Sequence, residues 1–132
     1  MKSFSLNRKE RVKKKNDFEK VYSSTKFFLS SNSLIKSVYT IDTASNDYGV
    51  KIAAAVSKKV GNAVWRNRIK RLIKESYRLN KSELVKKTLE KKLSLLIVFS
   101  PNRLSEASNK KVYLKDILPS VIELINKIKQ QI

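Results

Sequence analysis

Three stretches of the chain have the apolar, β-branched character of strands. Residues 33–41 and 50–57 are rich in the β-branched and aromatic residues that favour strands. The segment between them contains Asp, Asn, Ser and Gly, so we expect these two strands to pair as a hairpin. Residues 93–99 are almost continuously apolar, which indicates a buried strand that ends at Pro101. The pattern therefore predicts a sheet built from these three strands.

A short helix is predicted before the sheet. Asn16 is placed to cap this helix, with Glu19 at its third position. One face then carries three apolar or aromatic side chains at helical spacing, those of Phe18, Val21 and Tyr22. Residues 25–33 are rich in Ser and Asn, and we predict a loop there.

The central segment predicts a helix with one apolar and one basic face. At about 100° per residue, the apolar face carries Trp65, Ile69, Leu72, Ile73 and Ser76, with Tyr77 at its edge. The opposite face carries Asn67, Arg71, Lys74 and Arg78, flanked by Arg68 and Lys70. Asn62 is placed to cap the helix after a turn at Gly61. Arg66 in the first turn opposes the helix dipole, which is favourable only if this end faces phosphates.

Two further helices are predicted towards the C-terminus. Ser82 is placed to cap a short helix across 83–92. The last segment has an apolar stripe that Pro119 interrupts, so its helix is either kinked or begins there. The stripe consists of Leu114, Ile117, Leu118, Val121, Ile122, Ile125 and Ile128. Together the elements predict one small α/β domain, an α+β sandwich with the order α-β-β-α-(α)-β-α.

The charge of the chain indicates a polyanionic partner. Of its 132 residues, 30 are Lys or Arg and 11 are Asp or Glu, which gives a formal net charge of +19. The excess is concentrated in residues 1–28 and 58–78, with a neutral segment between them. Such clustering is typical of a binding surface, since charge needed only for solubility can be spread evenly. A nucleic acid is the first candidate and an anionic membrane surface the second.

The residue types that are absent exclude several kinds of chemistry. The chain has no Cys and no His, and so lacks disulfides, thiolate metal sites and a histidine general base. Asp17, Asp42 and Asp47 are interpreted as cap and turn residues, so we predict no catalytic residues and no metal site in the protein. Residues 1–132 are expected to form one domain with a basic arm at 1–15. No apolar run follows the basic start, and we expect a cytoplasmic protein.

The stretch SKKVGNAVWRNRIKRLIKESYRLN, residues 57–80, resembles the "RNR" signature of the protein subunit of bacterial ribonuclease P. The upstream stretch RVKKKNDFEKVY, residues 11–22, resembles the N-terminal segment of that family. The resemblance implies a fold with a left-handed βαβ crossover and a role in removing the 5′ leader from precursor tRNA. Catalysis would belong to the RNA subunit and its divalent metal ions, such as Mg²⁺. The implied partners are the ribonuclease P RNA and the leader, with no membrane and no obligate protein partner.

The resemblance also implies which residues bind RNA. On and before the central helix these are Lys58, Lys59, Asn62, Arg66, Asn67, Arg68, Lys70, Arg71 and Lys74. A cleft between the first helix and the sheet would hold the single-stranded leader, with Lys58 on its rim, through Arg11, Lys14, Phe18, Tyr22 and Tyr39. Bases would stack on the aromatic rings while cations follow the phosphates.

Two segments depart from the family pattern. Residues 25–33 lack the basic residues that are frequent there in the family. Residues 100–112 form a long loop, and Ser100 precedes Pro101 where a basic residue is expected. These differences concern peripheral contacts and leave both signature stretches intact.

Each functional interpretation has a simpler alternative. Phe18, Tyr22 and Tyr39 could be core side chains. The cations of the central helix could form a solvated face, but such faces normally mix charge signs, and Glu75 is the one acidic residue in 58–78. A ribosomal-type RNA-binding protein shares the composition but has no reason to combine both signature stretches. A membrane-surface role for the C-terminal helix is disfavoured by its small net charge.

Overall fold

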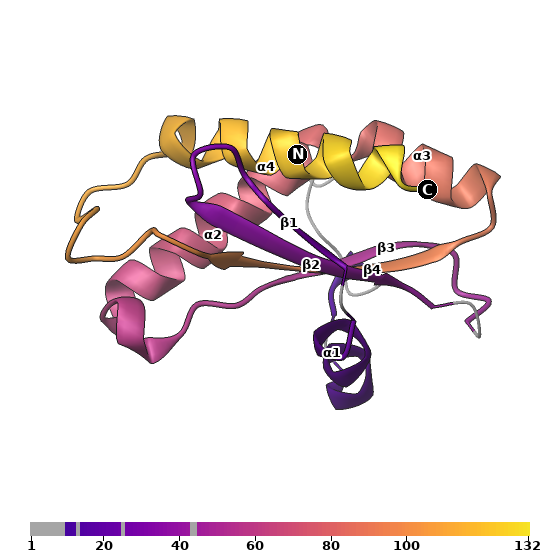
Figure 1. Ribbon diagram of the computed structural model, residues 1–132, viewed down its shortest axis with the longest axis horizontal. Coiled ribbons are helices and arrows are strands. Elements are labelled where there is room, and N and C mark those ends of the chain that lie inside the picture. Colours follow the sequence, from indigo (N-terminus) through magenta and orange to yellow (C-terminus); the bar gives the residue numbers. More distant parts are fainter. Residues whose placement is uncertain (1–9, 13, 25, 43–44) are drawn as a thin grey trace.

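The computed structural model describes residues 10–12, 14–24, 26–42 and 45–132 (Figure 1). Its elements in chain order are α1 (Lys15–Tyr22), β1 (Phe27–Leu29), β2 (Ile35–Ile41), β3 (Gly49–Ala54), the 3-10 turn η3 (Lys58–Val60), α2 (Ala63–Asn80), α3 (Ser82–Glu90), β4 (Ser94–Pro101) and α4 (Leu114–Gln130). Most of the predicted basic arm, residues 1–15, lies outside the described residues. Of its described part, Arg11 forms a bridge with Ile52 of β3.

β4 lies inside a mixed four-stranded sheet of order β1-β2-β4-β3. It pairs antiparallel with β2 and parallel with β3. Its side chains from Ser94 to Phe99 are all buried, so a position between two strands satisfies its backbone and covers both of its faces. The predicted hairpin is therefore wrong, because β4 separates β2 from β3. Instead, a crossover containing α2 and α3 joins β3 to β4, as a parallel pair requires.

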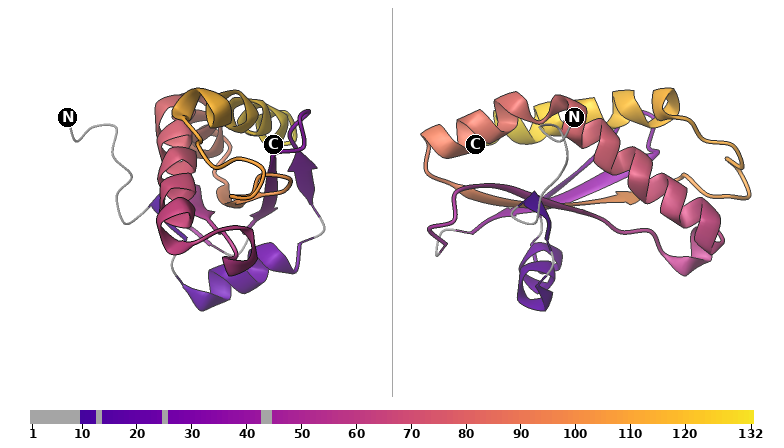
Figure 2. Two further views of the ribbon diagram at one scale, coloured as in Figure 1. Left: turned by 90° about the vertical axis from the view of Figure 1, so that its left-hand side faces the viewer. Right: turned by 180° about the vertical axis from the view of Figure 1, so that it is seen from behind.

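The sheet separates two unequal layers (Figures 1 and 2). α2, α3 and α4 cover one face, and the main core lies between them and the sheet. α1 lies on the opposite face, over a smaller apolar cluster whose buried members are Val12, Val21, Ala53, Leu96 and Val98. Phe27 of β1 is on this second face, since it pairs with Val38 of the smaller cluster, and it remains exposed. The second face is thus incompletely covered.

Two predicted helix caps are wrong, and the start of α4 decides between two alternatives. The carbonyl of Lys14 already accepts the first helical bonds of α1, so Asn16 lies within the helix and does not cap it. Ser82 is the first residue of α3, and that helix has no side-chain cap. α4 begins at Leu114 and continues through Pro119, so the helix does not begin at the proline.

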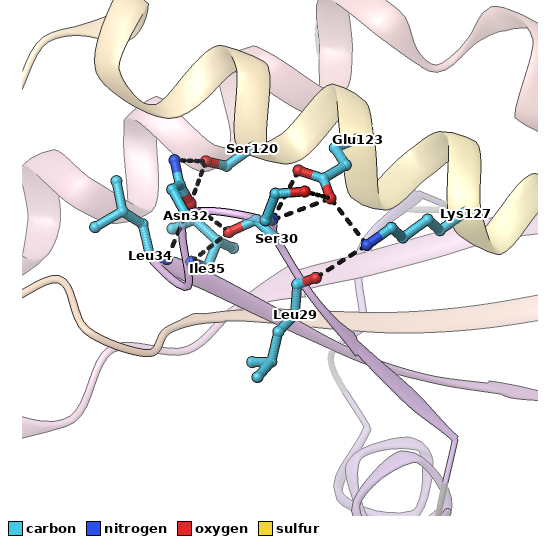
Figure 3. A network of polar contacts seen from close by, with 9 residues as sticks. Leu29, Ser30, Asn32, Leu34, Ile35, Ser120, Glu123 and Lys127 are labelled. Atoms are coloured by element: carbon cyan, nitrogen blue, oxygen red, sulfur yellow. Dashed lines mark hydrogen bonds and ion pairs between the residues drawn. The ribbon is translucent and has the colours of Figure 1, made fainter.

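A polar network holds the turn between β1 and β2 against α4 (Figure 3). The backbone N–H and the hydroxyl of Ser31 donate to the Glu123 carboxylate at 2.9 and 2.7 Å. Lys127 forms an ion pair with the same carboxylate at 2.8 Å. The Asn32 amide donates to the Ser120 hydroxyl at 3.0 Å. Residues 27–29 thereby form an edge strand, and the predicted loop across 25–33 is wrong there because these contacts come from α4, distant in sequence.

Candidate nucleic-acid interface

The first turn of α2 is locked by three residues. The Asn62 side chain accepts a hydrogen bond from the Trp65 N–H at 2.9 Å and so caps the helix as predicted. Gly61 lies against the indole, because a Cβ at this position would come within 2.5 Å of the Trp65 ring. Its φ of 175° is extended, so the glycine is required by this close approach. Trp65 is buried, as expected of a core side chain.

The long loop after β4 clamps this end of α2. The Glu106 carboxylate accepts from the backbone N–H of Asn62 at 2.8 Å and from its side-chain amide at 3.0 Å. The Glu106 N–H donates to the Val60 carbonyl at 2.7 Å. The Trp65 indole N–H donates to the Asn109 carbonyl at 2.9 Å. Residues 102–113 form the loop between β4 and α4, and all but Tyr113 belong to the segment 100–112 that departs from the family pattern in sequence. This loop therefore helps to position the signature helix.

Arg68 faces this loop as well. Its Nε donates to the Val112 carbonyl at 2.7 Å. Its guanidinium lies over the ring of Tyr113, 5.6 Å from the ring centre, within the range of a cation–π contact. The side chain that the signature predicts to bind RNA is thus oriented by the protein itself.

A concave basic surface runs along the other flank of α2. It encloses a cavity of about 410 Å³ lined by Arg11, Asn67, Lys70, Arg71, Lys74, Glu75 and Arg78, and we call it the basic groove. The pKa of Lys74 is lowered, first by its partial burial and then by the positive charges of Arg11 and Lys70. Glu75 forms an ion pair with Arg78. A site that opposes a further positive charge in this way is suited to receive an anion.

A second cavity lies beside α1. It has a volume of about 370 Å³ and is lined by Tyr22, Ala55, Val56, Ser57, Val60, Ser100 and Pro101, and we call it the α1 cleft. Tyr22 is 57% exposed there, and its ring stacks on that of Phe18 with the ring centres 6.3 Å apart. Phe18 itself is partly buried against the smaller apolar cluster. Tyr22 therefore offers a solvent-exposed aromatic ring, and the partly buried ring of Phe18 supports it.

Among the described residues, no group of three or more acidic side chains gathers where it could hold a metal ion. None of the helices formed by these residues is long and apolar enough to cross a membrane.

Comparison with known proteins shows which family the chain belongs to. A family model described as Ribonuclease P matches residues 6–124. The chain belongs to the ribonuclease P protein family. The ribonuclease P protein component of Clostridioides difficile is 39% identical over 122 residues, which cover 92% of this chain and 94% of that protein. That of Clostridium kluyveri is 44% identical over 117 residues, covering 89% and 92%.

Solved structures agree with this assignment. The ribonuclease P protein of Staphylococcus aureus matches with a TM-score of 0.66 and 25% identity, over 91% of this chain and 95% of that chain. The ribonuclease P protein of Thermotoga maritima, at 19% identity, shares the fold with a TM-score of 0.69, over 89% and 98% of the two chains. The single α+β domain predicted from the sequence is therefore confirmed.

The predicted RNA-binding residues of this ribonuclease P protein fall into separate groups. Four predicted helix residues line the basic groove, namely Asn67, Lys70, Arg71 and Lys74. Arg11, expected in the leader cleft, lines this groove too. Lys58 and Lys59 are exposed in η3, between Ser57 and Val60, two residues that line the α1 cleft.

The remaining predicted helix residues have partners or burial of their own. Asn62 and Arg68 are bonded to the 102–113 loop, which fixes the orientation of both side chains. The Nε of Arg66 is buried and has no hydrogen-bond partner among the described residues. Lys14 is exposed immediately before α1.

Tyr39 does not join the other predicted cleft residues. It is 5% exposed and belongs to the main core, where its ring stacks on Phe28 with the ring centres 5.8 Å apart. Burial raises the pKa of its phenol. Val38 and Tyr39 point to opposite faces because strand side chains alternate, and Val38 is the one that lies under α1. For Tyr39, the structure supports the core alternative.

Two residues near the cleft were missed from the sequence. Phe27 is 52% exposed, and the ammonium group of Lys36 lies 4.7 Å from the centre of its ring. Both lie on the α1 face of the sheet, as the pairing of Phe27 with Val38 and the strand alternation require. The FFL triplet of residues 27–29 has strand character, but the Ser and Asn residues around it favour a loop.

Proposed function

We propose that this ribonuclease P protein binds two RNA segments at once, the catalytic RNA subunit at the basic groove and the 5′ leader of precursor tRNA at the α1 cleft. The family is the protein component of ribonuclease P, an endoribonuclease whose catalysis is performed by RNA. The protein therefore contributes to removal of the tRNA 5′ leader by binding, and the proposal concerns which surfaces bind which RNA.

The observation that carries the proposal is the concentration of cations in the basic groove. Arg11, Lys70, Arg71, Lys74 and Arg78 line one cavity, with Glu75 as its acidic member. The pKa of Lys74 is lowered first by its partial burial and then by the positive charges of Arg11 and Lys70. Phosphates that enter the groove would relieve this repulsion. α2 is packed on the core through its other side, so this surface is held rigid and loses little entropy on binding.

The α1 cleft suits an unpaired strand. Its exposed Tyr22 offers a ring on which a base can stack, and Phe18 supports that ring. Lys58 and Lys59 are exposed at one end of the cleft and Lys14 at the start of α1, where they can follow phosphates. Phe27 and Lys36 extend the same sheet face and could receive further nucleotides.

Divalent metal ions, such as Mg²⁺, complete the proposal as partners of the RNA subunit. The protein would lower the repulsion between two polyanions and so reduce the metal concentration that they need for productive contact. If it neutralises about six phosphates of a single strand, log affinity falls with log salt at a slope of roughly −4. We place this activity in the cytoplasm.

The test is to measure binding and cleavage of precursor tRNA with and without its 5′ leader, using a bacterial ribonuclease P RNA and this protein near physiological salt. The proposal predicts rescue of cleavage at low magnesium and tighter binding only when the leader is present. Equal binding of both substrates with no stimulation of cleavage would instead favour a general RNA-binding protein of ribosomal type.

A further inference from the structure

An exposed aromatic ring lies outside both surfaces described above. Tyr113 directly precedes α4 and is 50% exposed. The guanidinium of Arg68 lies 5.6 Å from the centre of its ring and the ammonium of Lys115 lies 5.9 Å from it. Lys110 and Lys111, just before it in the loop, are exposed too. A large, half-exposed ring thus has two cations beside it, and two further exposed lysines lie close to it in sequence.

We propose that Tyr113, Arg68 and Lys115 form a separate binding site for an unpaired nucleotide of the RNA subunit. The base would stack on the Tyr113 ring and the Arg68 guanidinium, while Lys115 would contact the phosphate. The required nucleotide is unpaired, because bases within an A-form helix are not accessible to an aromatic side chain. The inference rests on the proposed function, since it assigns a further contact to the RNA that the basic groove binds.

The site is built rather than accidental. The Val112 carbonyl fixes the Arg68 guanidinium by accepting from its Nε at 2.7 Å. The Asp116 carboxylate accepts from the Tyr113 N–H at 2.9 Å and so fixes the backbone that carries the ring. A guanidinium and a ring that are already oriented lose little side-chain entropy when a base stacks on them.

The position of the site favours the RNA subunit over the leader. Tyr113 directly precedes α4, which covers one face of the sheet, whereas Tyr22 ends α1 on the opposite face (Figures 1 and 2). Arg68, by contrast, is on the same helix as the basic groove and lies between Asn67 and Arg71 in sequence, on the flank that faces the 102–113 loop. One RNA molecule can therefore contact both the Tyr113 site and the basic groove without crossing to the opposite face of the sheet.

The experiment compares Tyr113→Ala, Tyr113→Phe and Lys115→Ala for binding to a bacterial ribonuclease P RNA transcript across a salt series. Loss of one stacked base should weaken binding about 5- to 100-fold in Tyr113→Ala. The slope of log affinity against log salt concentration should stay unchanged. Tyr113→Phe keeps the ring and should bind like the wild type. Lys115→Ala should reduce the magnitude of the slope by about 0.7–0.9.

Tyr48→Ala is the matched control, because Tyr48 is also an exposed tyrosine but lies beside β3 and Leu89 of α3. The inference is overturned if Tyr113→Ala binds as tightly as Tyr48→Ala, or if Tyr113→Phe is as weak as Tyr113→Ala. It is also overturned if Tyr113→Ala changes only the preference for substrates that carry a leader. Arg71→Ala with Lys74→Ala, measured in parallel, tests the basic groove, so failure of the proposed function is seen separately.

Discussion

The carboxylate of Glu106 holds Asn62 through both of its oxygens, at 2.8 Å to the backbone N–H and 3.0 Å to the side-chain amide, although 44 positions separate the two residues in sequence. Asn62 in turn caps α2 by accepting from Trp65. The start of the signature helix thus depends on a loop that the signature does not include. The loop therefore helps to position the candidate RNA-binding helix, although Glu106 carries the same charge sign as RNA.

Glu106→Ala should therefore lower the free energy of unfolding by about 1 kcal/mol, since it removes two hydrogen bonds from a charged acceptor to the exposed Asn62. Urea denaturation followed by Trp65 fluorescence measures the change. Ser108→Ala, an exposed position in the same loop, is the control and should change stability little. An equal effect of the two substitutions would show that the contact does not stabilise α2.

Arg71→Ala combined with Lys74→Ala should reduce affinity for the RNA subunit and leave the fold intact. Two lost phosphate contacts lower the magnitude of the salt slope by about 1.4–1.8. Stability should change little, because Lys74 experiences the positive charges of Arg11 and Lys70. Binding assays across a salt series measure the slope, and thermal melts check the fold.

Lys86→Ala combined with Lys91→Ala makes the same charge change on exposed positions of α3 and its end. A slope that falls equally in both double variants would mean that overall charge, and not the basic groove, governs binding. Arg68→Ala is unsuitable for this comparison because it also removes the bond to the Val112 carbonyl.

Glu123 should make stability depend on pH in the acid range. Bonds from Lys127 and Ser31 lower the pKa of this carboxyl from the ordinary 4.5 to about 2 in the folded protein. Its stabilisation is therefore fully present above pH 4.5 and is lost as the pH falls from there through 2. Glu123→Gln should cost about 1–2 kcal/mol at neutral pH, after allowance for solvent screening.

The check is urea denaturation of the wild type and Glu123→Gln between pH 2 and 7. The difference between them should shrink as the pH falls below 4.5. Glu90→Gln, at an exposed residue whose ion pair with Lys86 is 4.0 Å long, is the control and should track the wild type. A constant difference across the range would contradict the assignment of the network in Figure 3.

The sequence predicted the elements of the fold better than their arrangement. The continuous apolar character of residues 93–99 correctly predicted a buried strand. The helical spacing of the apolar residues in 57–80 correctly predicted which side of α2 is buried. Periodicity carries no information on strand neighbours, however, and the turn residues at 42–49 favoured a hairpin that β4 prevents. β1 was missed because its stability depends on α4, through Ser31 and Glu123.

For the candidate site, the sequence indicated the cations but not their partners. The spacing of Arg71 and Lys74 placed both on the exposed side of α2, as found. The same spacing could not reveal that Arg68 is bonded to Val112, because the loop is remote in sequence. Arg11 reaches the basic groove through its pairing beside Ile52, a contact with an edge strand that local patterns do not encode.

Tyr22 and Tyr39 should respond differently to substitution, because only Tyr22 lines the α1 cleft. Tyr22→Ala should reduce the preference for precursor over mature tRNA about 5- to 100-fold, the loss of one stacked base, with a small change in stability. Tyr39→Ala should instead lower the free energy of unfolding by about 3–5 kcal/mol, as for other large core side chains. Tyr39→Phe should preserve both properties.

The measurements are affinities for the two tRNAs in the presence of the RNA subunit, together with urea denaturation of each variant. Phe18→Ala should affect both quantities, since its ring supports Tyr22 and also packs on the smaller apolar cluster. If Tyr22→Ala keeps the full preference for the leader, stacking at this ring does not hold the leader. If Tyr39→Phe loses that preference while its stability is unchanged, the phenol of Tyr39 contacts the leader, and the α1 cleft is not where the leader binds.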